Sequence, residues 1–203
     1  MSTPKPRIAV IVCTTRPSRW GMEPATWIRD KIEADGRMAA DIVDLATFDL
    51  PLFDEMASNK WMPSADPRAV AWQEAVGQYD GYVFVVAEYN HSISGALKNA
   101  LDQAFVEWGR KPAAMVGYGG VGAARAVEHL RNIAVELRMV NVASAVHVAA
   151  GAFMQAHPMG KGEGMGAVDA MLAPSAAEMI GELHWWADLL KGARAGAEDA
   201  AAA

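Results

Sequence analysis

The chain has 203 residues, of which 52% are hydrophobic and 21% charged, so it can bury a full core as one domain spanning residues 1–203. The formal net charge is −6 and no basic run is present, which argues against a nucleic-acid partner. Any anion that this chain binds must therefore be held by a local cluster of positive groups.

The cysteine content and the first residues indicate a compartment. Cys13 is the single cysteine, so no disulfide can form within the chain, which is consistent with a reducing environment. The first residues, MSTPKPR, lead directly into an apolar run without the features of a secretory signal. No apolar run approaches the length of a membrane span. We therefore expect a cytoplasmic protein with no membrane partner.

Apolar runs and helical spacings alternate along the chain. The apolar runs predict buried strands at residues 8–13, 41–45, 81–86, 113–117 and 143–149. Apolar residues at helical spacing predict helices at residues 23–34, 68–76, 96–105, within 118–140, and at 175–191. The connections at 46–67 and 151–166 are long, and loops of that length are often functional. The end of the chain, 192–203, is expected to be frayed.

This β-α alternation predicts an α/β fold with a parallel sheet and helices on both faces. Five strands, with polar loops after the first and third, fit a flavodoxin-like three-layer sandwich in the strand order 2-1-3-4-5. In that fold, ligands bind beyond the carboxyl ends of the strands, where the strand order reverses between strands one and three.

The segment AEYNHSISGALKNALD, residues 87–102, follows the central predicted strand and carries a dense group of polar side chains. Ser92 or Ser94 can cap the helix that follows. Glu88, Tyr89 and Asn90 are then left beside one another with no role in a simple turn. Their position at the end of a central strand favours a binding site.

The first loop, TTRPSRWG at residues 14–21, offers hydroxyl and guanidinium groups before a helix. Hydroxyls, arginines and a helix N-terminus together are suited to a phosphate. The candidate ligands are Thr14, Thr15, Arg16, Ser18 and Arg19. The alternative is a capped turn with two solvated arginines.

The third loop, GYGGVG at residues 117–122, matches the glycine pattern of dinucleotide sites. That fingerprint belongs on the first strand-helix unit, whereas this loop follows the fourth strand and Glu136 falls inside a helix. The better interpretation is close backbone approach to a flat ligand at Gly119 and Gly120. A tight strand-to-helix turn explains the same glycines.

Four segments in this order resemble the NADPH-dependent FMN reductase family, flavodoxin-like enzymes that include quinone, azo-dye and chromate reductases. They are TTRPSRWG, DLATFDLPLFDE, EYNHSISGALKNALD and YGGVGAARAVEHLR, and the resemblance covers roughly residues 7–150. Two departures are Ala87, where the family usually has proline, and Cys13-Thr14, where Gly-Ser is common.

The resemblance implies a site for FMN. The FMN phosphate would be held by Thr14, Arg16 and Arg19, with Thr15 and Ser18 beside them. The flavin ring would lie along Glu88, Tyr89 and Asn90, with Ser92 nearby, and be closed from the other side by Tyr118, Gly119 and Gly120.

The resemblance also implies the reaction. NADPH, or NADH, would pass a hydride to bound FMN, and the reduced flavin would pass electrons to a quinone, azo compound, metal oxyanion or free flavin. No obligatory catalytic side chain is expected, and His91 is expected at the surface or at the substrate edge. The family implies a homodimer or homotetramer.

Two other functions stay open. A flavodoxin-like electron carrier would bind FMN without oxidising NADPH. A low-molecular-weight phosphatase would use Cys13 and Arg19, which are spaced as in its phosphate loop, with Asp66 as the acid. Pro17 removes one donor from such a loop, and the segment 87–102 would be unexplained. No metal site is expected, because no metal-ligand spacing links the histidines His91, His129, His147, His157 and His184.

Overall fold

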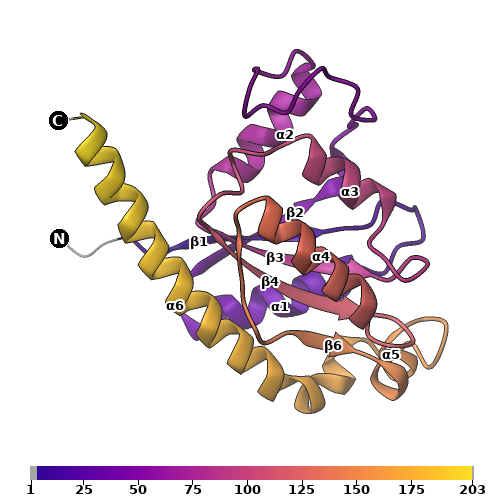
Figure 1. Cartoon of the computed structure of the whole chain (residues 1–203). Coiled ribbons are helices and arrows are strands. Elements are labelled where there is room, and N and C mark those ends of the chain that lie inside the picture. Colours follow the sequence, from indigo (N-terminus) through magenta and orange to yellow (C-terminus); the bar gives the residue numbers. More distant parts are fainter. Residues whose placement is uncertain (1–3, 203) are drawn as a thin grey trace.

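The computed structural model describes residues 4–202, which form a parallel sheet between two layers of helices (Figure 1). The strand order is β2 (Ala39–Asp44), β1 (Arg7–Val12), β3 (Gly81–Ala87), β4 (Pro112–Tyr118) and β5 (Val140–Asn141), and every pairing is parallel. The predicted flavodoxin-like order is confirmed. The reversal between β1 and β3 lies at the centre of the sheet.

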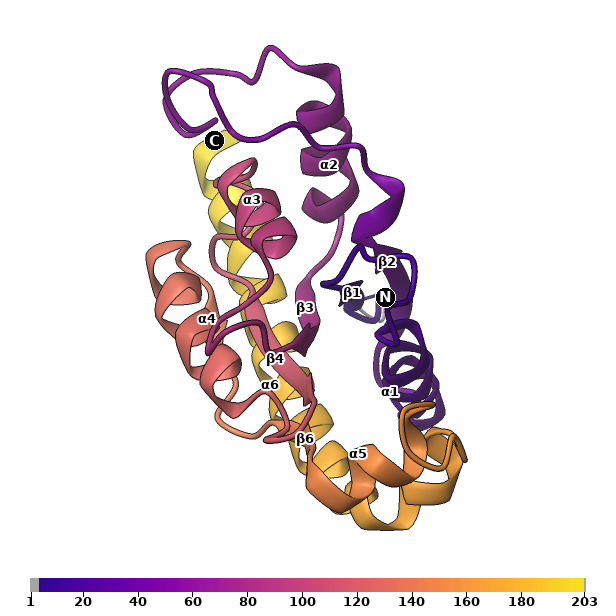
Figure 2. The same cartoon turned by 90° about the vertical axis from the view of Figure 1, so that its right-hand side faces the viewer.

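Alternation along the strands builds a separate core on each face. Ile8, Val10 and Val12 pack with α1 (Met22–Asp35) and α6 (Asp169–Ala202). Ala9 and Ile11 point the other way and pack with α2 (Pro67–Gly77), α3 (Gly95–Asp102) and α4 (Ala124–Glu136). Figure 2 looks across the two layers, with the helix α5 (Ala150–Ala156) beside α1. Both faces of β1 and β3 are buried, which is why their sequences read as continuous apolar runs.

The fifth strand differs from the prediction of one strand over 143–149. The structure has two short strands, β5 and β6 (Val146–Val148), and each pairs with β4. Between them Glu182 of α6 accepts hydrogen bonds from the N–H of Ala143 at 2.9 Å and the hydroxyl of Ser144 at 2.5 Å. These contacts occupy the backbone at the point where a continuous strand would have joined the sheet.

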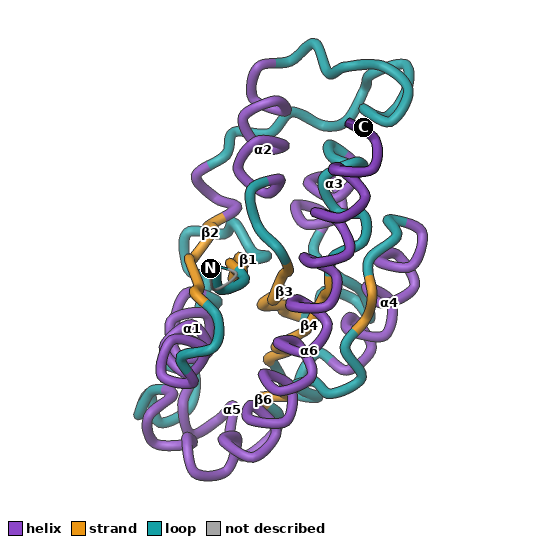
Figure 3. Tube along the Cα trace, turned by 90° about the vertical axis from the view of Figure 1, so that its left-hand side faces the viewer, coloured by secondary structure: helices purple, strands orange, loops and turns teal. Residues whose placement is uncertain are grey.

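The connections on either side of the sheet also differ in detail. The long connection after β2 begins with a short 3-10 turn, Leu45–Thr47, and residues 48–66 are then loop and turn, drawn in teal in Figure 3. The segment 151–166, expected as a loop, contains α5 and the start of a second 3-10 turn, Met165–Val168. The Gly- and Met-rich composition predicted a loop, and the helix α5 of seven residues was therefore not predicted.

The last helix starts earlier and ends later than expected. α6 begins at Asp169 rather than 175 and continues to Ala202, past the expected end at 191; Ala203 lies outside the described residues, and fraying of the tail over 192–203 stays a prediction. Arg194 donates to the carbonyl of Arg110 and to Asp80, both at 2.7 Å. An alanine-rich sequence favours helix. The contacts of Arg194 hold α6 beside the starts of β3 and β4 at that residue.

Candidate active site

The polar loops that follow β1, β3 and β4 meet at the carboxyl edge of the sheet, around a cavity of about 540 Å³. The side chains that line it are Arg16, Ser18, Arg19, Trp20, Ala87, Glu88, Tyr89, Tyr118, Gly119, Phe153, His157, Pro158 and Met159. Seven of the predicted site residues are therefore brought together. Thr15 instead lines a neighbouring cavity of about 400 Å³ with residues 45–50, Leu52, Gly95, Ala96 and Asn99.

The first loop divides its polar groups between structure and cavity. Thr14 is buried, and its hydroxyl lies 3.2 Å from the hydroxyl of Tyr118, so it joins two loops and does not line the cavity. Arg19 donates one terminal nitrogen to Asp44 at 2.5 Å and the other to the carbonyl of Arg16 at 3.4 Å, while its buried Nε has no hydrogen-bond partner among residues 4–202. The exposed Arg16 guanidinium lies 5.2 Å from the centre of the Tyr89 ring, and forms no ion pair with the described carboxylates. Within the described part of the chain, the Arg16 guanidinium and Nε of Arg19 are thus free to face a ligand.

The segment after β3 is a tight hairpin. Tyr89 and Ser92 exchange backbone hydrogen bonds of 2.9 and 3.1 Å, and the two residues between them, Asn90 and His91, have φ values of 51° and 67°. Left-handed backbone at both central positions is the geometry of a type I′ turn. The Tyr89 hydroxyl is buried and has no hydrogen-bond partner in the part of the chain that the structure describes.

Two predicted residues of this segment do not line the cavity. Asn90 is exposed at the tip of the turn, and the Ser92 hydroxyl lies 2.7 Å from Nδ1 of His129 on α4. Ser94, not Ser92, caps α3: its hydroxyl accepts from the N–H of Leu97 at 3.1 Å.

The glycines of the loop after β4 are needed mainly for the backbone conformation of the turn and less for contact with a ligand. A Cβ on Gly117 would lie 2.2 Å from the carbonyl oxygen of Gly122, and Gly122 has a φ of 61°. Gly119 donates its N–H to Val148 at 3.1 Å, so that group is not available to a flavin. Gly120 is exposed and lies outside the cavity lining, and its N–H has no backbone partner within residues 4–202.

Sequence reasoning missed one wall of the cavity, which is formed by Trp20, Phe153, His157, Pro158 and Met159. The Trp20 ring centre lies 5.4 Å from that of Tyr118, 5.8 Å from Phe153 and 5.1 Å from His157. Phe153 and His157 are four residues apart, the one helical signal within the Gly- and Met-rich segment.

His157 is held as a neutral ring. Burial lowers its pKa, with Glu23 opposing the shift, and the N–H of Met159 donates to Nδ1 at 3.0 Å. An Nδ1 that accepts a hydrogen bond assigns the proton to Nε2. The ring therefore contributes one N–H donor.

The lining fits a phosphorylated aromatic ligand. Arg16, Arg19 Nε and the Tyr89 hydroxyl are donors suited to phosphate or hydroxyl oxygens, and the aromatic wall is suited to a planar ring. The phosphatase alternative does not fit, because burial raises the pKa of the Cys13 thiol, which donates to the carbonyl of Ile11 at 3.2 Å.

No three His, Cys, Asp or Glu side chains among residues 4–202 come together as metal ligands would. No described helix is both long and apolar enough to cross a membrane.

Comparison with known proteins decides the family. A model of the NADPH-dependent FMN reductases matches residues 6–153. The chain belongs to this family. It is therefore an oxidoreductase that uses FMN together with NADPH or NADH.

Two relatives of this FMN reductase have both cofactors in their names. An NAD(P)H-dependent FMN reductase of Nectria is 32% identical over 126 residues, which span 59% of this chain and 63% of that relative. One from Saccharomyces cerevisiae is 31% identical over 155 residues, 70% of this chain and 80% of the relative. Among solved structures, the NAD(P)H:(acceptor) oxidoreductase FerB of Paracoccus denitrificans has a TM-score of 0.62 at 23% identity, covering 92% of this chain and 98% of its own, which supports the fold.

Proposed function

We propose that this FMN reductase oxidises NADPH or NADH and passes the electrons to a quinone. The observation that carries the proposal is the cavity, in which unpartnered donors from Arg19 and Tyr89 and the free Arg16 lie beside an aromatic wall. A relative from Burkholderia, a 2-hydroxy-1,4-benzoquinone reductase, is 32% identical over 141 residues, 66% of this chain and 73% of that protein. Its name supports a quinone over an azo compound, a metal oxyanion or free flavin.

The chemistry that FMN would supply when bound is a ring that can accept a hydride from NADPH or NADH and can then reduce the quinone. Arg16 and the free Nε of Arg19 hold the phosphate, with Ser18 beside them and Thr15 at the edge. Thr14 acts through its contact with Tyr118.

The ring-binding part of the site is built on the hairpin and on β4. Glu88 and Tyr89 line it directly, whereas Asn90 and Ser92 shape the turn that presents Tyr89. Tyr118 and Gly119 form the opposite side, with Gly120 at the rim. Trp20 and Phe153 exclude water, and His157 Nε2 offers one neutral donor to an acceptor oxygen.

The test is the visible spectrum of the purified protein with and without FMN, followed by anaerobic NADPH and then a quinone. We expect a bound flavin that bleaches with NADPH and recolours with the quinone. A flavin that binds but does not bleach would indicate an electron carrier. No flavin binding would refute the proposal. Parallel turnover with azo, chromate and free-flavin acceptors ranks the acceptor classes.

We also propose a homodimer or homotetramer. Leu52, Met56 and Trp61 on the loop 48–66, and Trp185 on α6, are each more than half exposed. Large apolar side chains at the surface are typical of subunit contacts. A monomeric mass in light scattering would contradict this. The cytoplasmic location, and the lack of nucleic-acid and membrane partners, stay predictions.

A further inference from the structure

The start of α4 holds the hairpin after β3 from outside the cavity. Arg125 donates through Nε to Glu88 at 2.6 Å and through Nη1 to Nε2 of His91 at 2.7 Å. One turn later on the same helix face, His129 Nδ1 lies 2.7 Å from the Ser92 hydroxyl. Two side chains at i and i+4 therefore contact three residues of the segment 88–92.

The hairpin needs such support. Asn90 and His91 both have left-handed backbone, which is costly for residues other than glycine and persists only where the surroundings fix it. The turn carries Tyr89, whose ring lies under the Arg16 guanidinium. If the turn relaxes, both the buried hydroxyl of Tyr89 and the position of Arg16 change together.

The charge on Glu88 depends on the same contact. Burial alone would raise the pKa of this carboxyl, but the hydrogen bond and the charge of Arg125 outweigh burial and hold it below its ordinary value. The Glu88 side chain is 10% exposed and lines the cavity, whereas Arg125 is 49% exposed and lies outside the cavity lining. Arg125 can therefore act on the site only through the residues that it holds.

We infer that Arg125 and His129 are positioning residues, which keep the hairpin 88–92 in the conformation that binds the flavin. This rests on the proposed FMN site. Neither residue lines the cavity, so neither is expected to touch FMN or the acceptor.

The experiment is an FMN titration of the apoprotein with Arg125→Met, which keeps the length of the side chain and removes its charge and donors. We expect FMN to bind about tenfold more weakly, because the competent turn becomes a minor conformation. Arg29→Met is the matched control: this arginine lies on α1 and pairs only with its neighbour Asp30 at 2.6 Å. Its FMN affinity should equal that of the wild type.

Two more variants keep the inference testable if Arg125→Met does not fold. Arg125→Lys keeps the charge but loses the guanidinium group, whose separate nitrogens reach Glu88 and His91 at the same time. We expect it to restore FMN affinity only in part. Full restoration would mean that the charge alone matters. His129→Phe should weaken FMN binding without changing the contacts of Arg125. Unchanged FMN affinity in all of these variants would refute the inference, whereas a wild-type protein that binds no FMN would refute the proposed function instead.

Discussion

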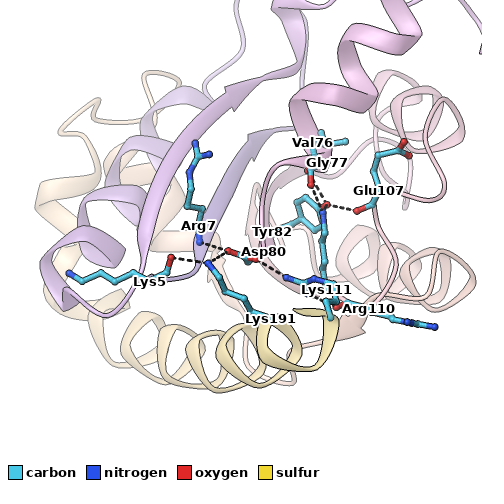
Figure 4. A network of polar contacts seen from close by, with 11 residues as sticks. Lys5, Arg7, Val76, Gly77, Asp80, Tyr82, Glu107, Arg110, Lys111 and Lys191 are labelled. Carbon is cyan, nitrogen blue, oxygen red and sulfur yellow. Dashed lines mark hydrogen bonds and ion pairs between the residues drawn. The ribbon is translucent and has the colours of Figure 1, made fainter. Parts of the chain in front are cut away.

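The substitution Asp80→Asn tests what holds the far end of α6 against the sheet. Asp80 accepts from the N–H of Arg7 at 3.0 Å, from Nζ of Lys191 at 2.9 Å and from Arg194 at 2.7 Å (Figure 4). These bonds join the starts of β1 and β3 to α6 at Lys191 and Arg194. Asparagine keeps the shape of the side chain and removes its charge.

The magnitude follows from the burial of the partners. The side chains of Asp80, Lys191 and Arg194 are 16%, 21% and 19% exposed, so solvent screens these ion pairs less than pairs at an open surface. A hydrogen bond to a charged group contributes about 1.5–3 kcal/mol and a neutral one about 0.5–1.5 kcal/mol. Asparagine has one acceptor oxygen in place of two, so the bonds from Lys191 and Arg194 are weakened or lost. This lowers the free energy of unfolding by about 2–3 kcal/mol, or the Tm by about 5–10 °C in a chain of this size.

The pH dependence gives this prediction a second test. Burial alone would raise the pKa of Asp80, but Lys191, the N–H of Arg7 and Arg194 outweigh burial and lower it. A carboxyl with a lowered folded-state pKa stabilises the fold above its unfolded pKa of about 3.9, and this contribution is lost as the pH falls through the folded-state pKa. The difference between wild type and Asp80→Asn should therefore be full at pH 7 and shrink below about pH 4.

The assay is denaturant unfolding at several pH values. Asp30→Asn is the control, because Asp30 is 63% exposed and pairs only with the adjacent Arg29, so we expect a change within about 0.5 kcal/mol. A loss for Asp80→Asn no greater than that of the control, or a difference that does not change with pH, would refute the reasoning.

Three further outcomes follow from single contacts. Arg16→Ala should weaken FMN binding by about 1.5–3 kcal/mol in a calorimetric titration, because it removes a charge-assisted hydrogen bond to the phosphate; equal affinity would contradict the assignment. Gly117→Ala should lower the free energy of unfolding by about 1–3 kcal/mol or more, since its Cβ would meet the carbonyl of Gly122 at 2.2 Å, whereas Gly120→Ala, with open space around it, should not. Cys13 should resist iodoacetamide at pH 8 until the protein unfolds, because burial raises the pKa of its thiol; rapid labelling of the native protein would contradict its burial.

The sheet could be predicted because its signals are local. An unbroken apolar run such as 81–86 requires burial on both faces, and alternation of strands with helices then leaves few topologies. The prediction of one continuous fifth strand was wrong because the residue that interrupts it, Glu182, lies 39 residues after Ala143 and is outside any local sequence pattern.

The sequence could predict which loops line the cavity, but not which of their polar groups are paired within the protein and which are free. The carboxyl ends of neighbouring parallel strands must meet, so the loops that contain Arg16, Tyr89 and Gly119 were expected together. Which groups stay free depends on contacts between distant segments. Asp44 forms an ion pair with one terminal nitrogen of Arg19, and the Ser92 hydroxyl lies 2.7 Å from Nδ1 of His129. Two residues predicted to bind the cofactor are therefore partly or wholly paired within the protein.

That division also says what kind of ligand the cavity selects. The groups already paired within the protein include an acceptor, the Glu88 carboxylate, which Arg125 neutralises. The groups left unpaired are Arg19 Nε, which can only donate, and the Tyr89 hydroxyl, which can donate. A buried donor without a partner costs about 1–3 kcal/mol, so a ligand that brings oxygen acceptors recovers energy that an apolar ligand of the same shape would not. A phosphorylated or hydroxylated cofactor is thus favoured because the groups that the protein leaves unpaired are hydrogen-bond donors. The aromatic wall that includes Trp20 adds the preference for a flat ring.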